Sequence, residues 1–262
     1  MLKLAISGKG GVGKTTLSSL LARILAAKGY KVIAIDANPD ANFGTALGIP
    51  FEEIQKITPI AEMDQLIEER TGAKPGTSAP FFKLNPKVDD IPDRFSVEKN
   101  GIKLLMLGTV QTGGGGCICP ESTLLKALLS HVILRRDEAI ILDMDAGVEH
   151  LARGTVRAVD AFIVVVEPGQ RSIQTARSVK KLAADLGVKT TYVVGNKVTG
   201  PEDIEFIRKA LPDFEVLGFL SADPKIREAD FKGLSPYDLA PNAVAEAEKI
   251  VKKLEQLHGG QK

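Results

Sequence analysis

A glycine-rich loop near the amino terminus is the feature that most restricts how this chain can fold. Residues 8–16 read Gly-Lys-Gly-Gly-Val-Gly-Lys-Thr-Thr, between an apolar strand pattern at 2–7 and a helical pattern at 15–28 that Gly29 ends. A strand, a loop of this form and a helix in direct succession are the context of a phosphate-binding loop. The loop therefore predicts a nucleotide-binding protein in which a sheet strand leads directly into a helix.

The rest of the chain alternates in the same way. Short runs rich in Val and Ile recur between helical patterns, and this alternation is typical of a mostly parallel sheet with helices on both faces. We therefore expect an α/β fold, with residues 1–262 forming a single P-loop domain. Further strands are expected at 31–36, 139–143, 161–167, 190–196 and 214–219, and helices at 122–134 and 243–257.

Residues 73–120 interrupt the alternation. The part at 73–100 holds four prolines and reads as a long surface excursion. Strand patterns at 94–98 and 102–107 flank Asn100-Gly101, a strong hairpin signal. A glycine run and a pair of cysteines follow. We expect residues 73–120 to form an excursion from the domain that contains a hairpin and a metal-binding Cys-x-Cys loop.

Composition excludes several classes of protein. The net charge is +1 and Lys and Arg form no blocks, so we expect no nucleic-acid partner. The chain holds no apolar run of about 18 residues and starts on a strand pattern rather than a signal peptide. We expect a cytoplasmic protein that does not bind membranes. The terminal helical stretch has an apolar stripe without aromatic residues, which favours docking on its own domain over membrane targeting: Val244, Ala247, Ile250, Val251, Leu254, Leu257.

The residue types of the loop fit the binding of ATP and Mg²⁺. Glycines let the backbone direct N–H groups at phosphate oxygens, and the helix that follows adds its positive dipole. Lys14 is expected to reach the β- and γ-phosphates and Thr15 to bind Mg²⁺. The expected nucleotide contacts of the loop are Gly8, Lys9, Gly10, Gly11, Val12, Gly13, Lys14, Thr15 and Thr16.

Asp143 ends an apolar strand pattern, as expected for a Walker B aspartate. We expect it to hold the Mg²⁺ shell through water. Ala146-Gly147 follows at the position of switch II, where a glycine N–H can contact a γ-phosphate.

The second lysine of the loop, Lys9, makes the motif more specific. A loop of the form Lys-Gly-Gly-x-Gly-Lys-Thr resembles the deviant Walker A motif of the MinD, ParA and nitrogenase iron protein class. The resemblance implies that Lys9 reaches the nucleotide of a partner subunit. It therefore implies a homodimer that encloses two ATP molecules and responds to the γ-phosphate.

The same resemblance assigns further contacts. An Asn at the end of a later strand reads the adenine edge in this class, and Asn196-Lys197 stands at that position. The loop at 221–224, which contains Asp223, is expected to wall the base.

One position departs from the class. Residues 36–42 read Asp-Ala-Asn-Pro-Asp-Ala-Asn, where the class has Asp-x-Asp and uses the second Asp to orient water. Asn38 cannot accept a proton as a carboxylate does. Either Asp36 or Asp40 takes that role, or the protein hydrolyses ATP slowly, or the residue was substituted to trap ATP. The sequence leaves these three alternatives open.

Cys117 and Cys119 are the only cysteines, and glycines precede them. Two thiols one residue apart can both bind one soft metal ion, but a closed thiolate site needs four ligands. A two-fold dimer would supply four from one repeated patch. Zn²⁺, Cu⁺, Ni²⁺ and iron–sulfur clusters all suit such ligands, and buried core cysteines or a redox pair are the alternatives.

Taken together, these features resemble the CooC family of nickel-insertion ATPases, which act in the maturation of carbon monoxide dehydrogenase. The resemblance spans residues 2 to about 225. Its motifs are the loop at 8–16, Leu-Asn-Pro-Lys-Val-Asp at 84–89, the pair Cys117 and Cys119, Met-Asp-Ala-Gly-Val-Glu-His-Leu at 144–151, and Arg153-Gly154. It implies an ATP-driven homodimer that holds one Ni²⁺ or Zn²⁺ ion between its subunits and delivers nickel to the dehydrogenase or a related nickel enzyme.

Three other functions compete with this hypothesis. A MinD- or ParA-like positioning switch would need a membrane or DNA surface. An iron–sulfur carrier would hold a cluster on the shared cysteines. A nitrogenase-like reductase has widely spaced cluster cysteines, one of them just after Walker B, where this chain has Met144 and Asp145.

Overall fold

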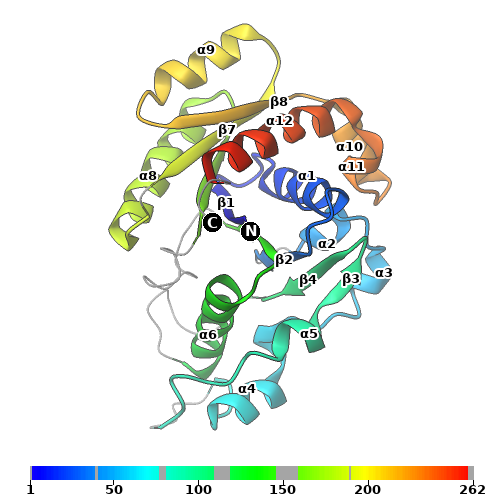
Figure 1. The fold of residues 1–262 in the computed structure, drawn as a ribbon, viewed down its shortest axis with the longest axis vertical. Coiled ribbons are helices and arrows are strands. Elements are labelled where there is room, and N and C mark those ends of the chain that lie inside the picture. The colour runs from blue at the N-terminus through cyan, green and yellow to red at the C-terminus, as the bar shows by residue number, and fades with distance from the viewer. Residues whose placement is uncertain are drawn as a thin grey trace.

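Eight strands form one sheet in the computed structural model, in the order β3-β4-β2-β5-β1-β6-β7-β8 (Figure 1). The structure describes residues 2–38, 41–76, 81–108, 119–145, 159–188 and 190–258. All neighbouring pairs are parallel except β3 and β4. The expected mostly parallel sheet is confirmed. The strands are β1 (Lys3–Gly8), β2 (Val32–Ala37), β3 (Val97–Lys99), β4 (Ile102–Met106), β5 (Ala139–Met144), β6 (Ala161–Val166), β7 (Thr191–Val198) and β8 (Glu215–Ser221).

The strand order decides which residues meet. β1 lies at the centre of the sheet between β5 and β6, and β5 also pairs with β2. In register, Asp143 of β5 lies beside Ile6 on one side and Asp36 on the other. Because parallel strands all end at the same edge of a sheet, the loop after β1 and the polar ends of β2, β5 and β7 share one edge.

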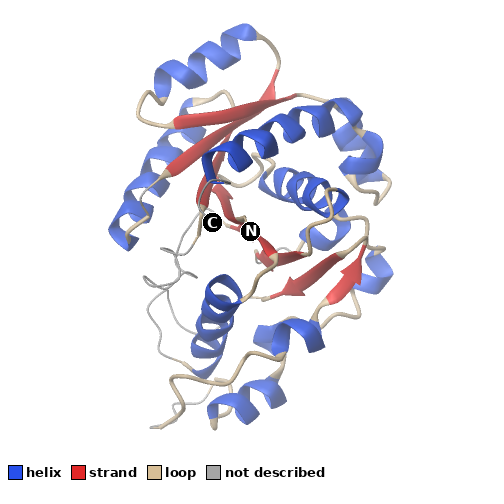
Figure 2. Ribbon diagram, in the orientation of Figure 1, coloured by secondary structure: helices blue, strands red, loops and turns tan. Residues whose placement is uncertain are grey.

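Helices cover both faces of the sheet (Figure 2). One layer has its core residues in α1 (Lys14–Ala27), α2 (Phe43–Ala46), α3 (Phe51–Ile54) and α12 (Pro241–His258), and α10 (Pro224–Phe231) and α11 (Pro236–Leu239) pack against it. The other layer has its core residues in η1 (Ile60–Glu62), α4 (Asp64–Thr71), α5 (Ile91–Phe95), α6 (Pro120–Arg135), α8 (Gln170–Leu186) and α9 (Pro201–Ala210). Two apolar cores, one on each face of the sheet, thus hold the fold together.

The terminal helix behaves as the sequence predicts. Its stripe packs on α1 and β8, with Ala247, Ile250, Val251 and Leu254 buried. Val244 is half-buried, and Leu257 at the end of the stripe is exposed. Within the described residues, no helix is both long and apolar enough to span a bilayer.

The excursion differs in part from the expectation. The hairpin is confirmed, since β3 and β4 pair antiparallel around Asn100-Gly101, both with positive φ. The expected strand start at Arg94 is wrong, because Ile91–Phe95 forms the short helix α5. Ile91 and Val88 are buried, so this part of the excursion is packed against the domain rather than lying on its surface.

An ion pair network ties the excursion to α4. Arg70 is almost fully buried, and its guanidinium donates to Asp90 Oδ2 at 2.8 Å and to Lys87 O at 3.3 Å. Arg94 donates to the same Asp90 oxygen at 2.7 Å. These two guanidinium groups lower the pKa of Asp90 to about 2. The segment before α5 is therefore fixed by a charge-assisted clamp.

We predict that Asp90→Asn lowers the free energy of unfolding at pH 7 by about 1–2 kcal/mol, because the buried guanidinium of Arg70 loses its carboxylate. The lowered pKa means that this stabilisation is present above about pH 4, the ordinary pKa range of Asp, and is lost as the pH falls towards 2. Urea unfolding at pH 7 and pH 3 measures both effects. The matched control is Asp89→Asn, whose exposed carboxylate lies 3.9 Å from Lys87 Nζ. An equal loss of stability in both variants would contradict the clamp.

Candidate nucleotide and metal site

The loop between β1 and α1 is shaped by glycines at two tight positions. Gly8 has a φ of 150°, and a Cβ there would lie 2.5 Å from the carbonyl oxygen of Val165. Gly13 has a φ of 93°, and a Cβ there would lie 2.1 Å from Asn196 Nδ2. By contrast, Gly10 has no heavy atom within 4 Å of a Cβ position. Gly8 and Gly13 are therefore required by the fold of the loop itself.

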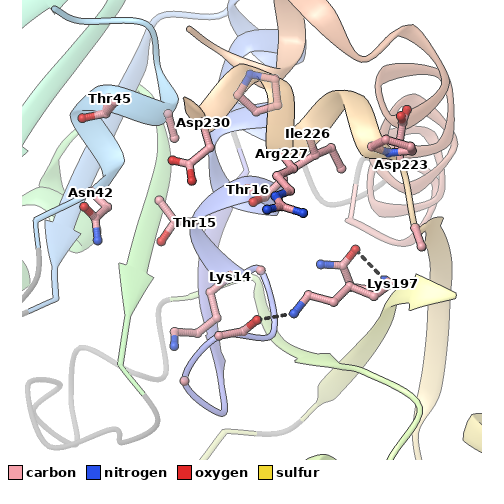
Figure 3. Close-up of a pocket in the computed structure, with 18 of the residues that line it drawn as sticks. Lys14, Thr15, Thr16, Asn42, Thr45, Lys197, Asp223, Ile226, Arg227 and Asp230 are labelled. Carbon is pink, nitrogen blue, oxygen red and sulfur yellow. Dashed lines mark hydrogen bonds between the residues drawn. The ribbon is translucent and has the colours of Figure 1, made fainter. Parts of the chain in front are cut away.

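The end of β7 holds the loop from the side of the sheet. Asn196 is buried and its amide donates to Val12 O at 2.7 Å. Lys197 Nζ donates to Gly11 O at 2.6 Å (Figure 3). In a trans peptide the C=O and the next N–H point in opposite directions. The N–H of Gly13 is therefore directed away from Asn196, as phosphate binding requires.

This arrangement adds a role to Asn196 that the sequence did not predict. Its Oδ1 accepts from the N–H of Lys197 at 2.9 Å, so both ends of the amide already contact the protein. An amide keeps a second hydrogen and a second acceptor lone pair. The expected contact with adenine stays a prediction beside this structural role.

Lys14 lies across the mouth of the loop. Its side chain is 9% exposed, and Nζ lies 3.5 Å from Lys9 O and 3.8 Å from Asp145 Oδ1. It thus already occupies the side of the cavity where the terminal phosphates are expected. Lys9 is half-buried and forms no ion pair with any residue that the structure describes.

Asp143 is the centre of the polar cluster. Its buried carboxylate accepts from Thr15 Oγ1 at 2.6 Å and from Asn38 Nδ2 at 2.9 Å, both at Oδ2. Ser18 Oγ lies 3.0 Å from Oδ1 and 2.9 Å from Lys14 O, so its one hydrogen serves one acceptor at a time. Burial raises the pKa of Asp143 to about 6, although these hydrogen bonds and Lys14 oppose the rise. Ser18, which lies one helical turn after Lys14, was not predicted from the sequence.

Asp36 lies next to this cluster and has a different environment. Its two oxygens accept from the backbone N–H of Phe43 at 2.9 Å and of Asn38 at 3.1 Å. Burial, followed by the nearby charge of Asp143, raises its pKa to about 7. Asn38 lines the open cavity, whereas Asp36 is enclosed, so the contacts of Asp36 favour a role in shaping the turn. Asp40 lies outside the described residues.

A cavity of about 1060 Å³ opens above the loop. Asn42 and Thr45 form one wall, and Arg227 and Asp230 of α10 form another (Figure 3). The sequence analysis identified neither wall, because these residues meet only in the folded chain. Asp223 also lines the cavity, but its Oδ1 caps α10 by accepting from the Lys225 N–H at 2.8 Å.

The cysteine pair is only partly described. Cys119 is half-buried and its carbonyl accepts from the Thr123 N–H at 3.0 Å at the start of α6. Because α6 connects the parallel strands β4 and β5, its first turn lies at the same sheet edge as the loop. Cys117 lies outside the described residues, as does the expected switch II at 146–151. Among the residues placed by the structure, no three or more His, Cys, Asp or Glu gather as a metal site.

Comparison with known proteins finds a matching family and close relatives. Residues 3–237 match the model of the CobQ/CobB/MinD/ParA nucleotide binding domain. The chain is 49% identical over 240 residues to the carbon monoxide dehydrogenase accessory protein CooC of Rhodospirillum rubrum, covering 92% of this chain and 91% of CooC. An uncharacterized ATP-binding protein of Methanocaldococcus jannaschii is 45% identical over 252 residues, covering 95% and 96% of the two chains.

Solved structures show the same fold. The septum site-determining protein MinD of Pyrococcus horikoshii, complexed with Mg-ADP, superposes with a TM-score of 0.66 at 20% identity, covering 98% of this chain and 96% of MinD. A plasmid partition protein of Borrelia burgdorferi bound to AMPPNP gives a TM-score of 0.70 at 16% identity, covering 98% and 99%.

We predict that Gly13→Ala lowers the free energy of unfolding by about 1–3 kcal/mol, because a Cβ would combine backbone strain with a clash against Asn196. The same change should weaken ATP binding at least tenfold by displacing the loop. Chemical unfolding and calorimetric titration with ATP measure the two effects. Gly10→Ala is the matched control for stability and should unfold like the wild type. A Gly13→Ala protein of unchanged stability would show that the loop is not held as described.

Asn38→Asp tests the amide that faces Asp143. The change replaces a hydrogen-bond donor with a third carboxylate, so we expect a loss of about 1–3 kcal/mol in the absence of Mg²⁺. Urea unfolding in a chelator at pH 8 measures it. The control is Asn42→Asp, which adds the same charge at an exposed position of the same cavity. Equal losses in the two variants would show that the amide of Asn38 has no special part.

Proposed function

Because this chain belongs to the CobQ/CobB/MinD/ParA family of nucleotide-binding ATPases, we propose that it is a dimeric metallochaperone that uses ATP to insert nickel into carbon monoxide dehydrogenase or a related nickel enzyme. The nucleotide half of the proposal rests on one contact: the Thr15 hydroxyl lies 2.6 Å from the Asp143 carboxylate at the mouth of a glycine-shaped loop. The metal half rests on the relation to CooC, an accessory protein of carbon monoxide dehydrogenase.

The residues at this point fit Mg²⁺. A hydroxyl and a carboxylate are the oxygen ligands that this hard cation prefers. When bound, Mg²⁺ would neutralise the charge of the β- and γ-phosphates. Thr15 would hold it directly and Asp143 through water, and the hydrogen bonds of Ser18 and Asn38 would keep the carboxylate oriented.

The two lysines of the loop would have different roles. Lys14 already faces the site where the terminal phosphates are expected, so it would hold them without a large change of rotamer. Lys9 would reach the nucleotide of the partner subunit and make closure of the dimer sensitive to the γ-phosphate. The base would lie towards α10, with Asn196, Lys197 and Asp223 around it. Hydrolysis is expected to be slow, since Asn38 stands where the class has a carboxylate.

Nickel is the substrate of this proposed activity. Cys117 and Cys119 of two subunits would provide four thiolates, which suit Ni²⁺ or Zn²⁺. Closure on ATP would set the geometry of these thiolates, and hydrolysis or product release would loosen it. This coupling requires that metal affinity differs between the ADP and ATP states.

The positioning-switch alternative receives less support. The apolar stripe of α12, which such a switch would need for a membrane, is used in packing against α1 and β8. The likeness to MinD and to the partition protein is a likeness of fold.

We predict that the protein binds about half a Ni²⁺ or Zn²⁺ ion per chain as a dimer, with different affinity in ADP and in a non-hydrolysable ATP analogue. Light scattering after size exclusion, combined with metal analysis, measures stoichiometry and mass together. Cys117→Ala/Cys119→Ala should bind no metal and keep its affinity for ATP. The control is Lys14→Ala, which should lose nucleotide binding and keep both thiols.

The outcomes separate the competing functions. Dimerisation with nucleotide but no metal would overturn the metallochaperone function and leave a nucleotide switch. A brown protein with visible absorbance after anaerobic preparation would indicate an iron–sulfur carrier. Equal metal affinity in both nucleotide states would remove the coupling.

A further inference from the structure

The helix that follows the cysteine pair has one buried and one open face. The buried face of α6 contributes Leu124, Leu128 and Val132 to the core under the sheet. On the opposite face Lys126, Ser130 and Leu134 follow each other at intervals of four residues. Such spacing aligns side chains along one side of a helix. The open face is therefore a continuous strip, and Thr123, which also lines the groove beside it, lies one turn nearer to Cys119.

A groove of about 740 Å³ runs between this strip and the chain before α5. Leu84, Pro86 and Val88 form its other wall, from a segment that passes beside α6 (Figure 1). The guanidinium of Arg70 holds the end of that segment through Lys87 O and Asp90, and core packing holds the wall formed by α6. A groove with fixed walls is suited to receive a partner without a large ordering cost.

The charged side chains that the structure places along the groove are basic. Lys126 and Arg135 line it beside His131, and no Asp or Glu lines it among the residues that the structure describes. Neither Lys126 nor Arg135 forms an ion pair with a residue in the described part of the chain. The two acidic side chains just before α5 have basic neighbours of their own, since Asp90 binds Arg70 and Asp89 lies 3.9 Å from Lys87. Lys126 and Arg135 thus give the groove a positive lining.

Exposed apolar side chains accompany this charge. Leu84 is 64% exposed and Leu134 is 50% exposed, and both line the groove. An apolar centre with a charged rim is the usual composition of a protein interface. Along the helix, the groove begins at Thr123 and ends at Arg135. With a rise of 1.5 Å per residue, these two residues lie about 6 Å and about 24 Å from Cys119 along the helix axis.

We propose that this groove docks an acidic segment of the protein that receives the metal ion, so that the receiving site is brought near Cys119 at the start of α6. The proposal rests on the metallochaperone function above. A second copy of this chain is a poorer occupant, because a two-fold axis placing groove on groove would bring Lys126 and Arg135 against the same charges.

The test measures binding of the full-length chain to immobilised nickel-free carbon monoxide dehydrogenase, with the non-hydrolysable ATP analogue present. We expect Lys126→Glu/Arg135→Glu to bind at least tenfold more weakly, and Lys126→Ala/Arg135→Ala to fall between it and the wild type. Raising the salt concentration should weaken the wild type more than the charge-reversed variant. Lys126 is half-buried on the open face of α6, and Arg135 is exposed at the last residue of the helix, so the fold should tolerate the changes.

The matched control is Lys181→Glu/Lys249→Glu, which makes the same change of net charge at exposed positions of α8 and α12. It should bind the dehydrogenase like the wild type. Equal binding by the groove variant, or no binding by the wild type, would overturn the docking proposal. Loss of homodimer mass in the groove variant alone would assign the groove to a contact between copies, and would overturn it too.

A separate measurement distinguishes failure of the function. If the wild type does not raise dehydrogenase activity when Ni²⁺ and ATP are supplied, the metallochaperone function falls, and with it the identity of the partner. If the wild type raises activity and the groove variant raises it equally, only the docking proposal falls.

Discussion

A single buried carboxylate connects the parts of this molecule that must act together. Asp143 lies at the second-last position of the central strand β5 and accepts hydrogen bonds from Thr15 on α1 and from Asn38 after β2. Without these contacts its charge would be expensive to bury, as its raised pKa indicates. The phosphate loop and the turn after β2 are therefore positioned by the same group, so a change at one is felt by the other.

On the side away from Asp143, the phosphate loop is held by one neutral and one cationic hydrogen-bond donor. Asn196 and Lys197 bind its carbonyls, while Thr15 binds the carboxylate at its far end. The loop is thus largely formed before nucleotide arrives, and binding need not include the entropic cost of ordering it. This explains why two of its glycines, Gly8 and Gly13, are required by the protein itself: the tightest approach, at Gly13, is to Asn196.

Sequence reasoning succeeded where one local rule dominates. The loop, the Val- and Ile-rich strands and the Asn100-Gly101 hairpin each have a strong local signal, and the structure has all of them. It failed at α5, where alternating residues around Arg94 imitate a strand although buried Ile91 starts a short helix. It also missed Ser18 and Arg227, because their importance comes from neighbours far away in the chain. Elements of four residues, such as α2 and α3, are too short for any periodicity to be read.

The hairpin has a consequence for how the molecule meets its neighbours. β3 forms one edge of the sheet, is only three residues long and carries Glu98 and Lys99. A short, charged edge strand is a poor template for another chain, which protects a sheet against aggregation through its edge. A protein that we propose to pair through its nucleotide face benefits from such protection.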